Sequence, residues 1–163
     1  MTPTRATLSQ SGFEGFVPVA DLPTASIPDV PGVYVVLREE AETPSFRTES
    51  VGGWFKDQDP SVAVGALEDA WVPDAQVLYV GGTGNGTSDA TLRTRLDQLR
   101  RYAAGEPVGH SGGRYLWQLR DRHRLLVAWK PVPNGEVKAA KTDLLAEFWD
   151  EHEALPFANL RWA

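Results

Sequence analysis

The sequence predicts a single small α/β (α+β) domain in which a central sheet is flanked by helices. Two apolar runs, residues 33–37 and 76–80, have the length and composition of buried strands. Two longer segments, residues 91–104 and 137–153, carry apolar side chains at the spacing of a helix that packs through one face. A chain of 163 residues, 42% of them hydrophobic, has the size and composition of one ordinary folded domain.

The rest of the chain begins with an arm and includes a long polar segment. The first 30 residues are rich in proline, serine and threonine, and three prolines between positions 18 and 28 interrupt any helix there. We therefore expect residues 1–30 to form an irregular arm that packs on a domain formed by residues 31–163. Residues 38–75 are polar and turn-rich, with one possible short helix at 63–71.

Residues 115–119 and 125–132 are two further apolar runs whose arrangement the sequence leaves open. They could pair as strands around a cluster of arginines, or the first run could be a helix capped by Ser111.

A glycine-rich loop, residues 81–89, joins the second predicted strand to the first helix, which is the setting of nucleotide-binding motifs. Thr87 stands where a P-loop has its lysine and where a dinucleotide fingerprint has its third glycine. We interpret the loop as a turn that opens the helix, whose first N–H groups could still attract a phosphate.

The composition excludes several classes of protein. Cysteine is absent, which excludes a disulfide scaffold, a thiol nucleophile and a cysteine-ligated metal site. The first ten residues lack the apolar core of a secretory signal, and no apolar run approaches the ~20 residues that span a bilayer. We therefore expect a soluble, cytoplasmic protein with no membrane partner.

The net charge is −6, but the basic residues are concentrated in one part of the chain. Residues 91–130 hold nine basic and three acidic side chains, whereas the rest of the chain holds seven basic and 19 acidic ones. This asymmetry indicates either a face that binds a polyanion or a solvated basic helix beside an acidic one. The candidate nucleic-acid contacts are arginines of this segment: Arg93, Arg100, Arg101, Arg114 and Arg122.

Two tripeptides on the predicted strands resemble those that name the GIY-YIG nuclease family. They are Gly32-Val33-Tyr34 and Tyr79-Val80-Gly81. The helix that follows carries Arg95 just before an apolar residue, where the family has its catalytic arginine. Residues 144–147, Leu-Leu-Ala-Glu, resemble the setting of the family's metal-binding glutamate, and Asn159 follows twelve residues later beside a proline turn. The resemblance covers about residues 31–160.

The resemblance implies a mostly antiparallel sheet with a long insertion, about 38–75, between its first two strands. It implies a metal-dependent endonuclease that hydrolyses phosphodiester bonds in nucleic acid, with DNA the expected substrate. Tyr34 and Tyr79 would activate water and position the phosphate, and Arg95 would clamp the phosphate through paired hydrogen bonds. Glu147 would hold one Mg²⁺ or Mn²⁺ ion, because such hard cations prefer oxygen ligands.

Other positions are expected to support this site or to depart from the family. Gly32, Gly81 and Asn159 are support positions, with Asn159 expected to hold the sheet edge or the tail by side-chain hydrogen bonds. Leu99 stands where many members carry a histidine, and His110 is the candidate replacement for proton transfer. The alternative is a non-catalytic regulatory module on the same fold. It would bind nucleic acid or, through its acidic surface or the insertion, a protein partner.

Overall fold

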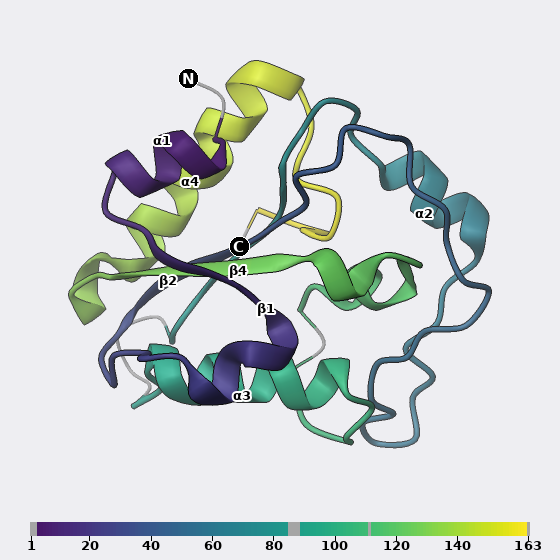
Figure 1. Cartoon of the computed structure of the whole chain (residues 1–163), viewed down its shortest axis with the longest axis horizontal. Helices are drawn as coiled ribbons and strands as arrows, with labels where there is room; N and C mark the ends of the chain where they lie inside the picture. Colours follow the sequence, from purple (N-terminus) through teal and green to yellow (C-terminus); the bar gives the residue numbers. More distant parts are fainter. Residues whose placement is uncertain (1–2, 85–88, 111, 163) are drawn as a thin grey trace.

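A four-stranded antiparallel sheet forms the centre of the protein (Figure 1). The computed structural model describes residues 3–84, 89–110 and 112–162. Within these residues the strands are β1 (Glu14–Pro18), β2 (Gly32–Leu37), β3 (Val77–Gly82) and β4 (Leu126–Pro131). The α-helices are α1 (Arg5–Gln10), α2 (Val64–Ala70), α3 (Leu92–Ala103) and α4 (Val137–His152), and the 3-10 helices are η1 (Val19–Thr24), η2 (Arg114–Gln118), η3 (Arg122–Arg124) and η4 (Asn134–Glu136). The strand order is β1-β4-β2-β3 with every neighbouring pair antiparallel, which confirms the α+β class and the antiparallel sheet.

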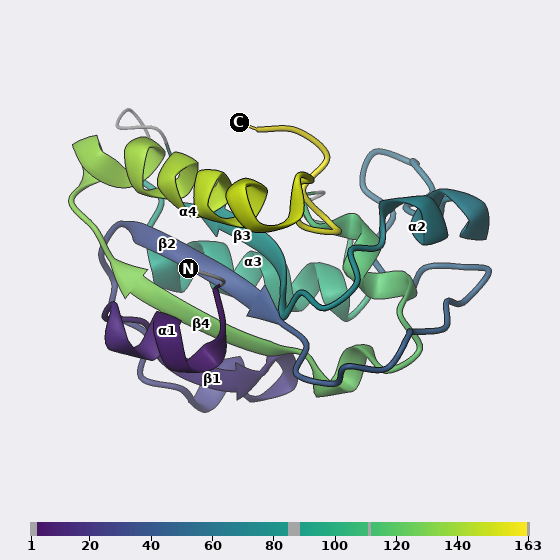
Figure 2. The same cartoon turned by 90° about the horizontal axis from the view of Figure 1, so that it is seen from above.

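Helices cover both faces of the sheet. Helix α3 lies against one face, and helices α1 and α4 lie against the other (Figures 1 and 2). Strand β2 is buried along its whole length, because its side chains alternate between the two faces of the sheet and helices cover both faces. Tyr34 and Val36 belong to the core beneath α3, whereas Val33 and Val35 belong to the core beneath α4. The side chain of Tyr34 therefore faces the helix that carries Arg95.

Helix α3 forms where the apolar spacing predicts it. Thr91 and Thr94 cap its first turn reciprocally, so two N–H groups that the helix leaves unpaired are satisfied. Leu92, Leu96 and Leu99 form a fully buried stripe on the side that faces the sheet. Burying a leucine contributes about 1.5–3 kcal/mol, so this stripe fixes the helix firmly in place.

The expectation of an irregular arm over residues 1–30 is wrong, because this segment contains α1 and the edge strand β1. Pro3 precedes α1, and Pro18 is the last residue of β1, so no proline interrupts either element. Strand β1 pairs with β4, and a Cβ on Gly15 would lie 2.5 Å from the ring of Trp129. Glycine at that position lets the two strands approach each other.

Residues 115–119 do not pair as a strand with residues 125–132. The first run forms η2 instead, beginning after Gly113 in a left-handed conformation, and the second forms β4. Gln118 explains this outcome, since its side chain donates to the carbonyls of Arg47 and Val62 and accepts from the Val62 N–H. Ser111, the proposed cap, lies outside the described residues.

The polar segment between β2 and β3 contains one short helix, α2, whose two ends lie within one residue of the predicted range 63–71. It lies to one side of the sheet (Figure 1), and Leu67 anchors it in the core. Of the glycine-rich loop, Gly81 and Gly82 complete β3, while residues 85–88 lie outside the described part. Among the described residues, no helix combines the length and apolar composition needed to cross a membrane.

Candidate functional site

A cleft of about 550 Å³ lies beside β3, one of the two edge strands of the sheet. Four cationic side chains from four parts of the chain line it: Arg95 from α3, Arg114 from η2, Lys141 from α4 and Arg161 from the C-terminal tail. No carboxylate is found among the described residues that line it. We call this feature the cationic cleft. Its electrostatics favour an anion.

The two tyrosines of the paired tripeptides lie at the inner end of the cationic cleft. Their ring centroids are 6.1 Å apart across the β2–β3 pair. Tyr79 lines the cleft, while Tyr34 is fully buried behind it. Gly81 lies directly opposite Tyr34 in the strand register, and a Cβ there would collide with the phenol ring. Glycine at this position therefore makes room for Tyr34, which explains the support role expected of Gly81.

His110 packs against the first of these tyrosines. Its Nε2 lies 3.4 Å from the Tyr34 hydroxyl, and the side chain is 1% exposed. Burial, with a smaller contribution from the Arg95 guanidinium, lowers the pKa of His110 to about 3. The imidazole is therefore neutral at pH 7, and its Nε2 either donates a hydrogen bond to the Tyr34 hydroxyl or accepts one from it, depending on the tautomer.

The charge of Arg95 acts on the side chains of four residues from different parts of the structure: Tyr34, Tyr79, His110 and Lys141. Burial raises the pKa of both Tyr34 and Tyr79, and the Arg95 guanidinium opposes that rise. Burial lowers the pKa of Lys141, and the charges of Arg161 and Arg95 lower it further. An anion bound among these cations would relieve their mutual repulsion.

Asn159 joins the C-terminal tail to the edge of the sheet, as the sequence predicts. The Val80 N–H donates to its Oδ1 at 2.8 Å, and its Nδ2 donates to the Val80 carbonyl at 2.9 Å. The Ala158 N–H also donates to the Leu78 carbonyl at 2.8 Å. These bonds fix the tail at the cleft, which places Arg161 two residues later among the cations. At Gly32, a Cβ would collide with a backbone carbonyl of β4, consistent with its support role.

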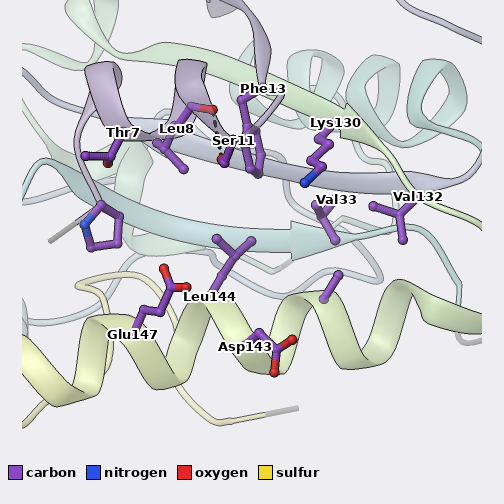
Figure 3. Close-up of a pocket in the computed structure, with 12 residues that line it drawn as sticks. Thr7, Leu8, Ser11, Phe13, Val33, Lys130, Val132, Asp143, Leu144 and Glu147 are labelled. Carbon is purple, nitrogen blue, oxygen red and sulfur yellow. Dashed lines mark hydrogen bonds between the residues drawn. The ribbon is translucent and has the colours of Figure 1, made fainter. Parts of the chain in front are cut away.

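Glu147 does not join this group, so the expectation that it shares a cleft with Tyr34, Tyr79 and Arg95 is wrong. It lines a separate pocket of about 270 Å³ between α4 and α1, together with Asp143. Figure 3 shows Glu147 extending from α4 into that pocket. The reason is the helix period: Glu147 lies on the side of α4 that faces α1.

Lys141 is the residue that α4 contributes to the cationic cleft. Glu147 lies six positions further along α4, which places the two side chains about 120° apart around the helix axis. Val137, Lys141, Leu145 and Phe148 follow one another at intervals of four, four and three residues, and the other three are buried. A lysine inside an apolar stripe is the sequence signal that could have identified it.

Most of the predicted nucleic-acid contacts lie elsewhere. Arg93, Arg100 and Arg101 line a groove of about 640 Å³ on the outer side of α3. Arg93 donates to the Ile27 carbonyl, and the other two pair with acidic side chains. Arg122, on η3, donates to two backbone carbonyls. Only Arg114 of this set lines the cationic cleft.

The side chains of the cationic cleft do not fit a Mg²⁺ or Mn²⁺ ion. Mg²⁺ is usually held by one or two carboxylates with water or substrate oxygens. The side-chain oxygens that the described lining offers are those of the Tyr79 phenol and the Asn159 amide, and both polar atoms of the amide are already bonded to the backbone of β3. Among the described residues, no group of three or more acidic or histidine side chains is placed to hold a metal.

Comparison of the chain with protein-family models, with curated proteins and with solved structures gives no match.

Proposed function

We propose that the protein binds nucleic acid by holding a backbone phosphate in the cationic cleft. The observation that carries this proposal is the convergence of four cations, with no carboxylate among the described lining residues. Arginine suits phosphate because its planar donors match the phosphate oxygens in pairs. A cytoplasmic location, expected from the sequence, accords with this ligand.

A nucleic acid, rather than a free small anion, is favoured by two further features. Arg161, one of the four cations that line the cleft, is exposed, so a phosphate that belongs to a long chain could reach it. Strands β2 and β3 place the two tripeptides side by side, with Tyr34 opposite Gly81 and with Arg95 facing the tyrosine pair. This arrangement supports the resemblance to GIY-YIG nucleases and favours DNA as the first ligand to test.

Hydrolysis of the phosphodiester is the second candidate function. It is favoured by a neutral imidazole, His110, in contact with Tyr34 next to the cations. In that case Arg95 and Lys141 would neutralise charge that develops on the phosphate. His110 would orient the Tyr34 hydroxyl through their hydrogen bond, because a pKa of about 3 does not suit the proton transfer expected of it. The role of metal ligand expected for Glu147 receives no support from its position in another pocket.

Binding is tested by fluorescence anisotropy with a short labelled oligonucleotide and two arginines of the same helix. Arg95→Ala removes a charged hydrogen-bond donor from the cleft and should weaken binding about 10- to 150-fold, which corresponds to about 1.5–3 kcal/mol. Arg93→Ala is the matched control on the outer side of α3 and should bind like the parent.

Arg161→Ala repeats the test where the side chain is exposed and folding is not at risk. It should also weaken binding. Equal affinities for the parent, Arg95→Ala and Arg161→Ala would contradict the proposal.

Cleavage is tested with supercoiled plasmid, in the presence of Mg²⁺ or Mn²⁺ and in the presence of a chelator. If the cationic cleft is the catalytic site, Lys141→Met abolishes nicking and Glu147→Gln nicks like the parent. The opposite pattern would restore Glu147 as the metal ligand. Binding without any nicking would support a non-catalytic module.

A further inference from the structure

Two exposed tryptophans lie beside the cationic cleft, on the far side of Lys141. Trp162 lines a second hollow of about 220 Å³, and Lys141 lines both the hollow and the cleft. Trp149, on α4, contacts Trp162 with ring centroids 5.5 Å apart. Each indole is 41% exposed. Large aromatic side chains that remain exposed next to a charged site indicate a binding surface.

The hollow has the composition expected around a flat aromatic ring attached to a phosphate. Trp162 forms one wall, and the buried side chain of Val137 is also part of the lining. Lys138 and Lys141 place positive charge at its edge, and Thr142 offers a hydroxyl. The described lining contains no acidic residue. The hollow therefore suits a nucleobase better than an aliphatic or cationic group.

We propose that Trp162 stacks an unpaired nucleobase of the strand whose phosphate lies in the cationic cleft, so that the preferred ligand is single-stranded nucleic acid. This inference rests on the proposed function, because the cleft must hold the phosphate. Lys141 lines both the cationic cleft and the hollow, and Arg161 of the cleft directly precedes Trp162 of the hollow. Neighbouring parts of one nucleotide chain can therefore reach the cleft and the hollow together. Stacking on an indole tolerates any base, whereas bases inside a duplex are already stacked.

The experiment compares two single-stranded probes, oligodeoxythymidine and an abasic oligonucleotide of the same length. The parent should bind the first more tightly, since only the first has bases to stack. Trp162→Ala should weaken binding of oligodeoxythymidine about 5- to 150-fold and leave the abasic probe unaffected. Trp162→Phe should restore most of the lost affinity. Trp54→Ala is the matched control, because Trp54 is 56% exposed and lines neither hollow.

The outcomes separate this inference from the proposed function. If the abasic probe binds and is weakened by Arg161→Ala, while Trp162→Ala keeps the parent's affinity for oligodeoxythymidine, the stacking inference is overturned and phosphate binding stands. Equal affinity of the parent for duplex and single strand also overturns the inference. If neither probe binds, both proposals fail.

Discussion

His110 should make the stability of the protein depend on pH in a way that one substitution removes. Its pKa is about 3 in the folded protein and about 6.5 in an unfolded chain. Above pH 6.5 the imidazole is neutral in both the folded and the unfolded state, so burying it requires no loss of a proton and the free energy of unfolding has its full value. As the pH falls from about 6.5 towards 3, only the unfolded state takes up the proton, so the free energy of unfolding falls. At pH 5 the loss amounts to about 2 kcal/mol.

The assay is urea unfolding of the parent and of His110→Gln at about pH 7.5 and pH 5. Glutamine can still bond to the Tyr34 hydroxyl but does not titrate. The parent should therefore lose about 2 kcal/mol more than the variant between the two pH values. His123→Gln, at an exposed histidine on η3, is the control and should follow the parent. Parallel losses in the parent and His110→Gln would refute the claim that His110 is buried in its neutral form.

Two further predictions concern the residues that shape the cleft. Gly81→Ala should destabilise the protein by about 1–3 kcal/mol in urea unfolding, because the new Cβ collides with Tyr34. Gly65→Ala is its control, since no atom outside its neighbours in α2 lies within 4 Å of the added methyl, and it should be neutral or stabilising by about 0.4–1 kcal/mol. Asn159→Leu should lower the free energy of unfolding by about 1–3 kcal/mol, because two backbone groups of Val80 lose their partners. Oligonucleotide binding should also weaken, because the C-terminal tail that carries Arg161 is no longer held at the cleft. Unchanged stability in Gly81→Ala or in Asn159→Leu would contradict the respective contact.

Much of the fold follows from periodicity that is visible in the sequence. The segments predicted as β2, β3, α3 and α4 form these elements, because apolar runs and stripes must be buried wherever they occur. Tyr34, Tyr79, Arg95 and His110 come together because they lie on or near these predictable elements.

The failures arise where long-range contacts decide the structure. Strand β1 owes its place to pairing with β4 around Gly15, and the run at η2 is held by Gln118, a single side chain that bonds two distant segments. Neither contact leaves a periodic signal. On α4, a motif match favoured Glu147, although the apolar stripe runs through Lys141. The face of a helix is a firmer guide to a cleft than similarity over four residues.

The salt dependence of binding tests the central claim most directly. Affinity for a short single-stranded oligonucleotide is measured over a series of salt concentrations for the parent, Lys141→Met and Lys130→Met. Each phosphate neutralised on a single strand contributes about −0.7 to the slope of log affinity against log salt concentration. Lys141→Met should flatten the slope by about 0.7, and Lys130→Met, in the pocket with Glu147, should keep the parent's slope. An unchanged slope in Lys141→Met would show that the cationic cleft does not hold phosphate.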